Sequence, residues 1–118
     1  MSRTTSVIRT YHDSWTAGDF GTAVSLLADD LTVEVPVNQY PTAESFGAAL
    51  KTFGSLATSV ELHAAMSDGN DAMLLYDMDL PGLGMLRVAE HFTVRDGKIV
   101  RIRQVHDTAA LRESGLVG

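Results

Sequence analysis

Residues 85–106, MLRVAEHFTVRDGKIVRIRQVH, contain two strand-like runs on either side of a turn. Apolar and polar side chains alternate in residues 85–94, as they do in a strand with one buried face, and residues 99–106 are rich in valine and isoleucine. Asp96-Gly97 lies between the two runs, and this dipeptide favours the tight turn of a hairpin. The segment therefore predicts an antiparallel β-hairpin.

Two further strands precede this hairpin. From Ser59 onward, apolar residues recur at every second position, and residues 73–80 form the next apolar run. Residues 68–71 (DGND) and 81–84 (PGLG) are rich in turn-forming residues and separate the runs. The C-terminal half of the chain thus predicts a four-stranded antiparallel meander.

The N-terminal part carries a helical period instead. A stripe of apolar residues at helical spacing predicts a first helix over residues 3–17, with Gly18 as its C-terminal stop. The stripe consists of Val7, Ile8, Tyr11 and Trp15. Asp19 can cap a second, short helix that ends near residues 28–30. The two helices predict a helical hairpin.

A short strand and a third helix complete the pattern. Residues 31–35 alternate and are partly β-branched, and Pro36 ends this strand or confines it to a sheet edge. Thr42 is the expected N-cap of the third helix. Helices that precede an antiparallel meander indicate an α+β domain, with the helices on one face of a curved sheet. The space enclosed by such a sheet is the expected ligand site.

The composition is that of a globular protein and excludes several classes of function. Of the 118 residues, 45% are hydrophobic and 20% are charged, and the formal net charge is −6. Lysine and arginine are scattered singly, which argues against nucleic acid as a partner. Cysteine is absent, and no histidine cluster has metal-ligand spacing, so we expect no metal. Without a signal sequence or a membrane span, the chain is expected to be cytoplasmic and free of membranes.

Four segments resemble the ketosteroid isomerases and the SnoaL-like polyketide cyclases. They are AGDF (17–20), LADDLTVEVPV (27–37), EHFTV (90–94) and DGKIV (96–100). The similarity runs from about Ile8 to the C-terminus. It implies a single α+β domain, residues 1–118, with the cone-shaped nuclear transport factor 2-like (cystatin-like) fold, in which N-terminal helices pack on a curved antiparallel sheet. It also implies chemistry that needs no cofactor.

The ketosteroid isomerases suggest an oxyanion hole in this chain. The resemblance places their helix tyrosine on Tyr11 and their protonated acid on Glu90, while their general base falls on Val35. An aliphatic side chain cannot accept a proton, and Glu34 should point to the opposite face of the strand. Tyr11 and Glu90 could equally be a buried structural pair.

The SnoaL-like cyclases suggest other proton carriers near the end of the last strand. Their acid falls on Asp107. His106 is a second candidate, because an imidazole suits proton transfer near neutral pH and because the resemblance places His106 and Gln104 on the wall of the cavity. The catalytic candidates are therefore Tyr11, Glu90, His106 and Asp107.

The remaining predicted contacts make the cavity mostly apolar and suited to an apolar small molecule. They are Trp15, Val35, Leu62, Met66, Tyr76, Met78, Leu80, Phe92 and Gln104. Three functions stay open: an isomerase or cyclase that moves a proton on a carbonyl compound, a non-catalytic module for a lipophilic ligand, and an epoxide hydrolase. The last function would need two aspartates and an arginine inside the cone, which Arg87 and Arg101 do not obviously supply.

The convex face of the sheet is expected to meet water or a second copy of the chain. Strand alternation turns His63, Asp77 and Asp79 outward, and Arg101 shares their face. Because the resembling families commonly dimerise through this face, we expect a homodimer formed through the sheet.

Overall fold

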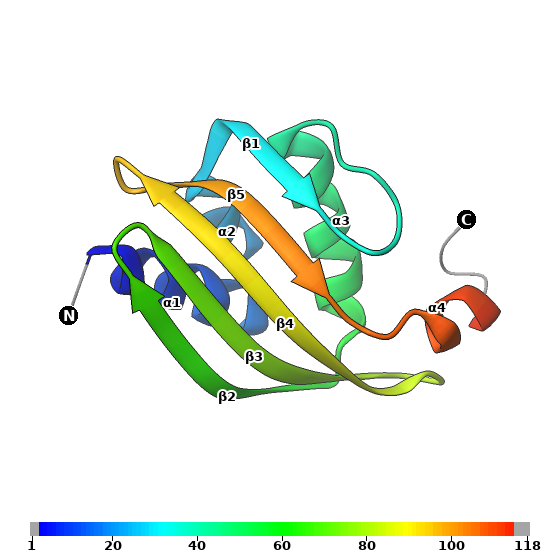
Figure 1. The fold of residues 1–118 in the computed structure, drawn as a ribbon. Helices are drawn as coiled ribbons and strands as arrows, with labels where there is room; N and C mark the ends of the chain where they lie inside the picture. The colour runs from blue at the N-terminus through cyan, green and yellow to red at the C-terminus, as the bar shows by residue number, and fades with distance from the viewer. Residues whose placement is uncertain (1–2, 115–118) are drawn as a thin grey trace.

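The computed structural model describes residues 3–114 of the chain. Its helices are α1 (Arg3–Thr16), α2 (Phe20–Ser25), α3 (Ala43–Leu56) and α4 (Ala109–Ser114). Its strands are β1 (Leu27–Glu34), β2 (Ser59–Asp68), β3 (Asp71–Leu80), β4 (Gly84–Arg95) and β5 (Lys98–Val105). They form one sheet in the order β1-β5-β4-β3-β2, in which β1 runs parallel to β5 and all other pairs are antiparallel. Figure 1 shows the sheet curving around α1, α2 and α3.

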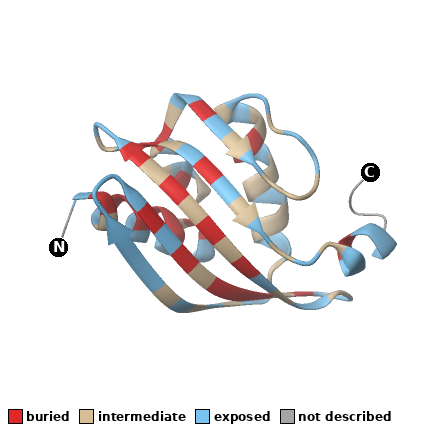
Figure 2. Ribbon diagram, viewed as in Figure 1, coloured by how far each residue is buried: buried red, intermediate tan, exposed pale blue. Residues whose placement is uncertain are grey.

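The core lies between the helices and the concave face of the sheet. The apolar stripe of α1 is buried there, as its spacing predicts. Buried bands cross β3, β4 and β5 in Figure 2, because every second side chain of these strands faces the helices. Gly18 ends the first helical segment with a φ of +86°, a conformation that favours glycine. The α+β architecture predicted from the order of elements is confirmed.

The second helix and the first strand differ from the prediction. Asp19 caps α2 as expected, since its Oδ1 accepts a hydrogen bond from the backbone N–H of Thr22 at 3.2 Å. However, α2 ends at Ser25, and β1 already begins at Leu27. The backbone N–H of Ile99 donates to the carbonyl of Leu26 at 2.8 Å, so pairing with β5 decides this boundary. Local helix propensity does not contain that information.

The third helix begins as predicted. The Thr42 hydroxyl accepts from the backbone N–H of Ser45 at 3.0 Å, and the Ser45 hydroxyl accepts from the Thr42 N–H at 3.1 Å. This reciprocal capping box satisfies two backbone donors at the helix terminus. It fixes the residue at which α3 begins.

A β-bulge in β2 reverses one side-chain direction that the strand alternation predicts. Leu62 pairs with Tyr76, whereas Ala64 pairs with Leu75, so one extra residue is inserted between these pairs. Every side chain after the bulge changes face. Met66, predicted to face the interior, is 71% exposed on the convex face, and that prediction is wrong.

The C-terminal tail forms a short helix, α4, which the alternation of the preceding strand does not predict. Its Leu111 is buried, and the backbone N–H of Ala109 donates to Asp107 Oδ1 at 3.0 Å. In Figure 1, α4 lies beyond the C-terminal end of β5, near the start of β4. Across the described residues 3–114, no helix is both long and apolar enough to cross a membrane.

Candidate functional site

A cavity of about 100 Å³ lies inside the cone, between the concave face of the sheet, α1 and α3. Nine of the predicted site residues line it: Tyr11, Trp15, Val35, Tyr76, Met78, Leu80, Glu90, Gln104 and His106. They come from α1, three strands of the sheet and the segments that follow β1 and β5. The fold therefore gathers residues that are up to 95 positions apart in the sequence into one wall.

Glu90 is the central titratable group of the cavity. It lies on β4 and is 1% exposed. Its Oε2 accepts a hydrogen bond of 2.6 Å from Gln104 Nε2, and the two residues are directly paired across β4 and β5. Burial raises the pKa of Glu90 to about 7, although the hydrogen bond from Gln104 and, after it, the nearby Tyr76 hydroxyl partly oppose that rise. Near neutral pH, Glu90 is therefore divided between the acid and the carboxylate.

The second oxygen of Glu90 and the hydroxyl of Tyr11 are both buried, and neither has a hydrogen-bond partner among the described residues. Tyr11 lies on α1 with its ring edge against Phe92, at a centroid separation of 5.6 Å. Burial, and then the charge of Glu90, raise the pKa of Tyr11 well above its usual value, so the phenol keeps its proton. Because Gln104 donates to Oε2, a proton on neutral Glu90 belongs on Oε1. Tyr11 and neutral Glu90, which both line the cavity, thus each carry a buried O–H group.

His106 stands just beyond the end of β5, two residues after Gln104, and lines the same cavity. Its Nδ1 lies 3.0 Å from the backbone carbonyl oxygen of Asp107. A carbonyl oxygen only accepts, so this contact places the proton of the neutral ring on Nδ1 and leaves a lone pair on Nε2. Val35, where the resemblance implies a base, also lines the cavity and offers no proton acceptor.

Three other predicted residues lie outside the cavity. Asp107 is exposed, and it caps the start of α4 instead of facing the cone. Phe92 is fully buried, but it packs on Tyr11 in the core, because only the middle of β4 reaches the cavity. Leu62 is half-buried beside the core, close to the edge of the sheet. The structure thus does not bring Asp107, Phe92 and Leu62 to the site, and Met66 is on the opposite face.

Several lining residues were missed by sequence reasoning. The largest are Val37, Tyr40, Phe46, Leu50, Phe53, Leu86, Val88 and Leu111. The apolar stripe of α3 supplies three of them, and its helical period is a signal that could have placed them on the inner side of that helix. Val37 and Tyr40 lie in an irregular loop, for which periodicity gives no direction. Leu111 depends on the tertiary position of α4.

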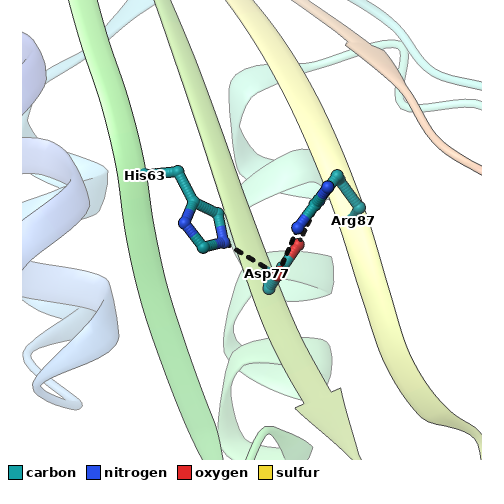
Figure 3. Close-up of polar contacts among 3 residues, drawn as sticks. All are labelled: His63, Asp77 and Arg87. Atoms are coloured by element: carbon teal, nitrogen blue, oxygen red, sulfur yellow. Dashed lines mark hydrogen bonds and ion pairs between the residues drawn. The ribbon is translucent and has the colours of Figure 1, made fainter.

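A separate polar cluster lies on the convex face of the sheet (Figure 3). Asp77 Oδ1 accepts from Arg87 Nε at 2.7 Å, and its Oδ2 accepts from Arg87 Nη2 at 2.9 Å and from His63 Nε2 at 2.8 Å. The hydrogen bonds from Arg87 and then His63 hold the pKa of Asp77 well below its usual range. Asp77 lies outside the cavity as predicted, but its two partners cover it. Within residues 3–114, no group of three histidine or acidic side chains could hold a metal ion.

Comparison with solved structures places the chain among small cone-shaped proteins. A protein from Kribbella flavida shares 28% sequence identity over 92% of this chain and 90% of its own, with a TM-score of 0.87. A nuclear transport factor 2-like protein of unknown function from Cytophaga hutchinsonii has a TM-score of 0.82 at 17% identity, over 92% of this chain and 94% of that protein. A ketosteroid isomerase-like protein from Kribbella flavida has a TM-score of 0.79 at 18% identity, covering 91% and 79% of the two chains.

At such low identities, the last two likenesses show the fold alone. No curated protein matches the chain. The family comparison is more specific, because the SnoaL-like domain matches residues 8–102 and so covers most of the sequence. That range contains α1 from Ile8 onward, the complete β2–β4 meander and all but the last residues of β5. The chain belongs to the SnoaL-like domain family, and its fold is the α+β cone that a nuclear transport factor 2-like protein also has.

Proposed function

We propose that this protein binds an apolar carbonyl compound inside the cone and moves a proton on it without a cofactor, as an isomerase or a cyclase does. One observation carries the proposal. The Tyr11 hydroxyl and Glu90 Oε1 are buried in the same cavity without a partner among the described residues, and a carbonyl oxygen could accept hydrogen bonds from both.

The two O–H groups would stabilise negative charge as it develops on the oxygen of the ligand. Loss of a proton from the carbon beside a carbonyl forms an enolate, whose charge rests largely on that oxygen. A neutral Glu90 can donate to the enolate, which an ionised Glu90 cannot do. A pKa of about 7 keeps roughly half of Glu90 in its acid form at neutral pH.

His106 is the proposed proton carrier. It lines the cavity, and the lone pair on Nε2 can accept a proton from the carbon beside the carbonyl and return it to another carbon. Asp107 is a weaker candidate, because it caps α4 and lies outside the cavity. The base would thus come from the end of β5 instead of from position 35.

Exchange of cyclohexanone α-protons in deuterium oxide, followed by proton NMR, tests the proposal. The native protein should accelerate exchange, and His106→Ala should lower the rate by at least about a hundredfold. Glu90→Leu removes a donor and should also slow exchange, by a similar factor. Glu90→Gln keeps an N–H donor, so its rate should persist at alkaline pH, where Glu90 of the native protein is ionised. Equal rates for the native protein and for His106→Ala would refute the proposed chemistry.

A non-catalytic binding module is the competing function. Val35 favours it, because this residue places an aliphatic side chain on the cavity wall where the resemblance implies a base. The same experiment separates the two functions, since a binding module would shift the NMR signals of the ligand without exchanging its protons. Epoxide hydrolysis ranks below both, because among the described residues the cavity is lined by one carboxylate, Glu90, and by no arginine.

We also propose that a second copy of the chain covers the convex face of the sheet. Exposed apolar side chains are distributed along that face: Met66, Met73, Met85 and Val105. Sedimentation should give twice the 12.7 kDa of one chain, and Met73→Glu should shift the protein to the single-chain mass. A native protein that sediments as a single chain refutes this interface.

The cytoplasmic location stays a prediction, which cell fractionation tests.

A further inference from the structure

We infer that the cavity takes a ligand with a single ring and one hydrogen-bonding oxygen, and that Leu111 of α4 sets this upper limit of size. The inference deepens the proposed function by naming the class of ligand and rests on the same cavity. It differs from what the resemblance implies, because steroids and aromatic polyketides contain several fused rings.

The volume of the cavity limits the ligand to a single ring. Cavities that hold drug-sized ligands measure roughly 300 to 1,000 Å³, whereas a dry apolar cavity of roughly 150 Å³ holds benzene. The cone cavity measures about 100 Å³. With modest side-chain movement it therefore matches one six-membered ring, and two fused rings exceed it.

The distribution of polar atoms in the cavity matches a ligand with one hydrogen-bonding oxygen. Tyr11 and Glu90 both line the cavity and carry two buried O–H groups that have no partner among the described residues, while the residues around them are mainly aliphatic and aromatic. Gln104 Nε2 already donates a hydrogen bond of 2.6 Å to Glu90 Oε2. One oxygen on the ligand satisfies the two donors. Away from that oxygen, the polar side chains of the lining are few, among them Tyr40, Tyr76 and His106, so most of the ligand meets apolar side chains. A cyclic monoketone fits both conditions.

Leu111 separates the cone cavity from a second cavity. It is 5% exposed and lines the cone cavity on one side and a second cavity, of about 320 Å³, on the other. Leu80 and Leu86 also line both cavities, but they belong to β3 and β4, whose ladder runs from Asp71–Thr93 to Leu80–Gly84. Leu111 is held by a helix of six residues. Truncating its side chain is thus the change that joins the two cavities while leaving the sheet intact.

The test compares the binding of cyclohexanone and α-tetralone, in which a benzene ring is fused to the cyclic ketone. In ligand-observed NMR titrations, the native protein should bind cyclohexanone and should bind α-tetralone at least about tenfold more weakly. Leu111→Ala should improve the affinity for α-tetralone by at least about tenfold. Leu83→Ala is the matched control, because Leu83 lines only the second cavity and its truncation does not join the two.

Two results would overturn the inference. The first is a native protein that binds α-tetralone as tightly as cyclohexanone, or that binds neither. The second is a folded Leu111→Ala variant, with a native circular dichroism spectrum, that gains no affinity for α-tetralone. If Leu111→Ala does not fold, Leu111→Val replaces it, and a gain for α-tetralone over the Leu83→Ala control is again required.

Failure of the proposed chemistry would look different from failure of this inference. Cyclohexanone that binds without exchange of its α-protons would refute proton transfer and leave the size limit standing. Exchange of α-tetralone protons by the native protein, at a rate equal to that of cyclohexanone, would support the chemistry and refute the size limit.

Discussion

Replacing Glu90 with glutamine should reveal a pH dependence of stability that two buried groups conceal in the native protein. The second group is His12 on α1, which is 3% exposed and packs between the rings of Trp15 and Tyr76, at centroid distances of 5.4 and 5.0 Å. Its Nδ1 has no hydrogen-bond partner among the described residues. Burial is the main reason that the pKa of His12 falls from 6.5 to about 4.

The two groups change the stability in opposite directions. The folded pKa of His12 lies below its unfolded value, so the unfolded state binds more protons between pH 4 and 6.5, and stability rises with pH. The folded pKa of Glu90 lies above its unfolded value of 4.5, so stability falls as the pH rises towards 7. Each gap corresponds to roughly 3 kcal/mol in total, of which roughly 2 kcal/mol is expressed between pH 4.5 and 6.5.

Urea denaturation at a series of pH values measures these contributions. Between pH 4.5 and 6.5, the free energy of unfolding of the native protein should change by less than about 1 kcal/mol. In Glu90→Gln it should rise by roughly 2 kcal/mol, and in His12→Phe, which keeps a ring, it should fall by a similar amount. The carboxylates whose pKa is lowered, such as Asp77, titrate below this range. Profiles of both variants that run parallel to the native profile would refute the reasoning.

Two further substitutions test the packing and the start of α3. A Cβ added at Gly54 would lie 2.7 Å from the ring of Phe20, so Gly54→Ala should destabilise the fold by roughly 1 to 3 kcal/mol in urea. Gly21→Ala, whose Cβ meets only Asp19 at 3.9 Å, should not, and equal losses would contradict this packing. Thr42→Ala should cost about 1 kcal/mol by removing the capping hydroxyl, measured in the same way. Thr52→Ala in the middle of α3 is its control and should be neutral; a Thr42→Ala variant as stable as this control would contradict the capping role.

The strands and turns of the meander could be predicted because their signals are local. Asp96-Gly97 and the alternation around it set the hairpin of β4 and β5, although a register shift between Thr93 and Val94, which no local signal gives, is needed to bring Glu90 opposite Gln104. The direction of Glu90 into the cavity therefore followed from the period of its own strand, and its pairing with Gln104 did not. The Thr42 cap of α3 is equally local.

The features that were missed depend on contacts between distant segments. β1 begins at Leu27 because it pairs with Ile99, 72 positions later in the chain. The bulge in β2 that turns Met66 outward is set by its register with β3. Likewise, the position of Leu111 on the wall depends on where α4 packs against the end of the sheet. No local period encodes these long-range pairings.

A titration of the Glu90 side chain tests most directly whether the cone holds the oxygen of a ligand with a neutral acid. The carboxyl carbon of labelled glutamate can be followed by NMR, with Glu90→Gln to assign the signal. We predict a midpoint near pH 7 that rises when cyclohexanone binds, because the ligand accepts a hydrogen bond only from the protonated form. A midpoint near the usual value of 4.5, unchanged by the ligand, would contradict it.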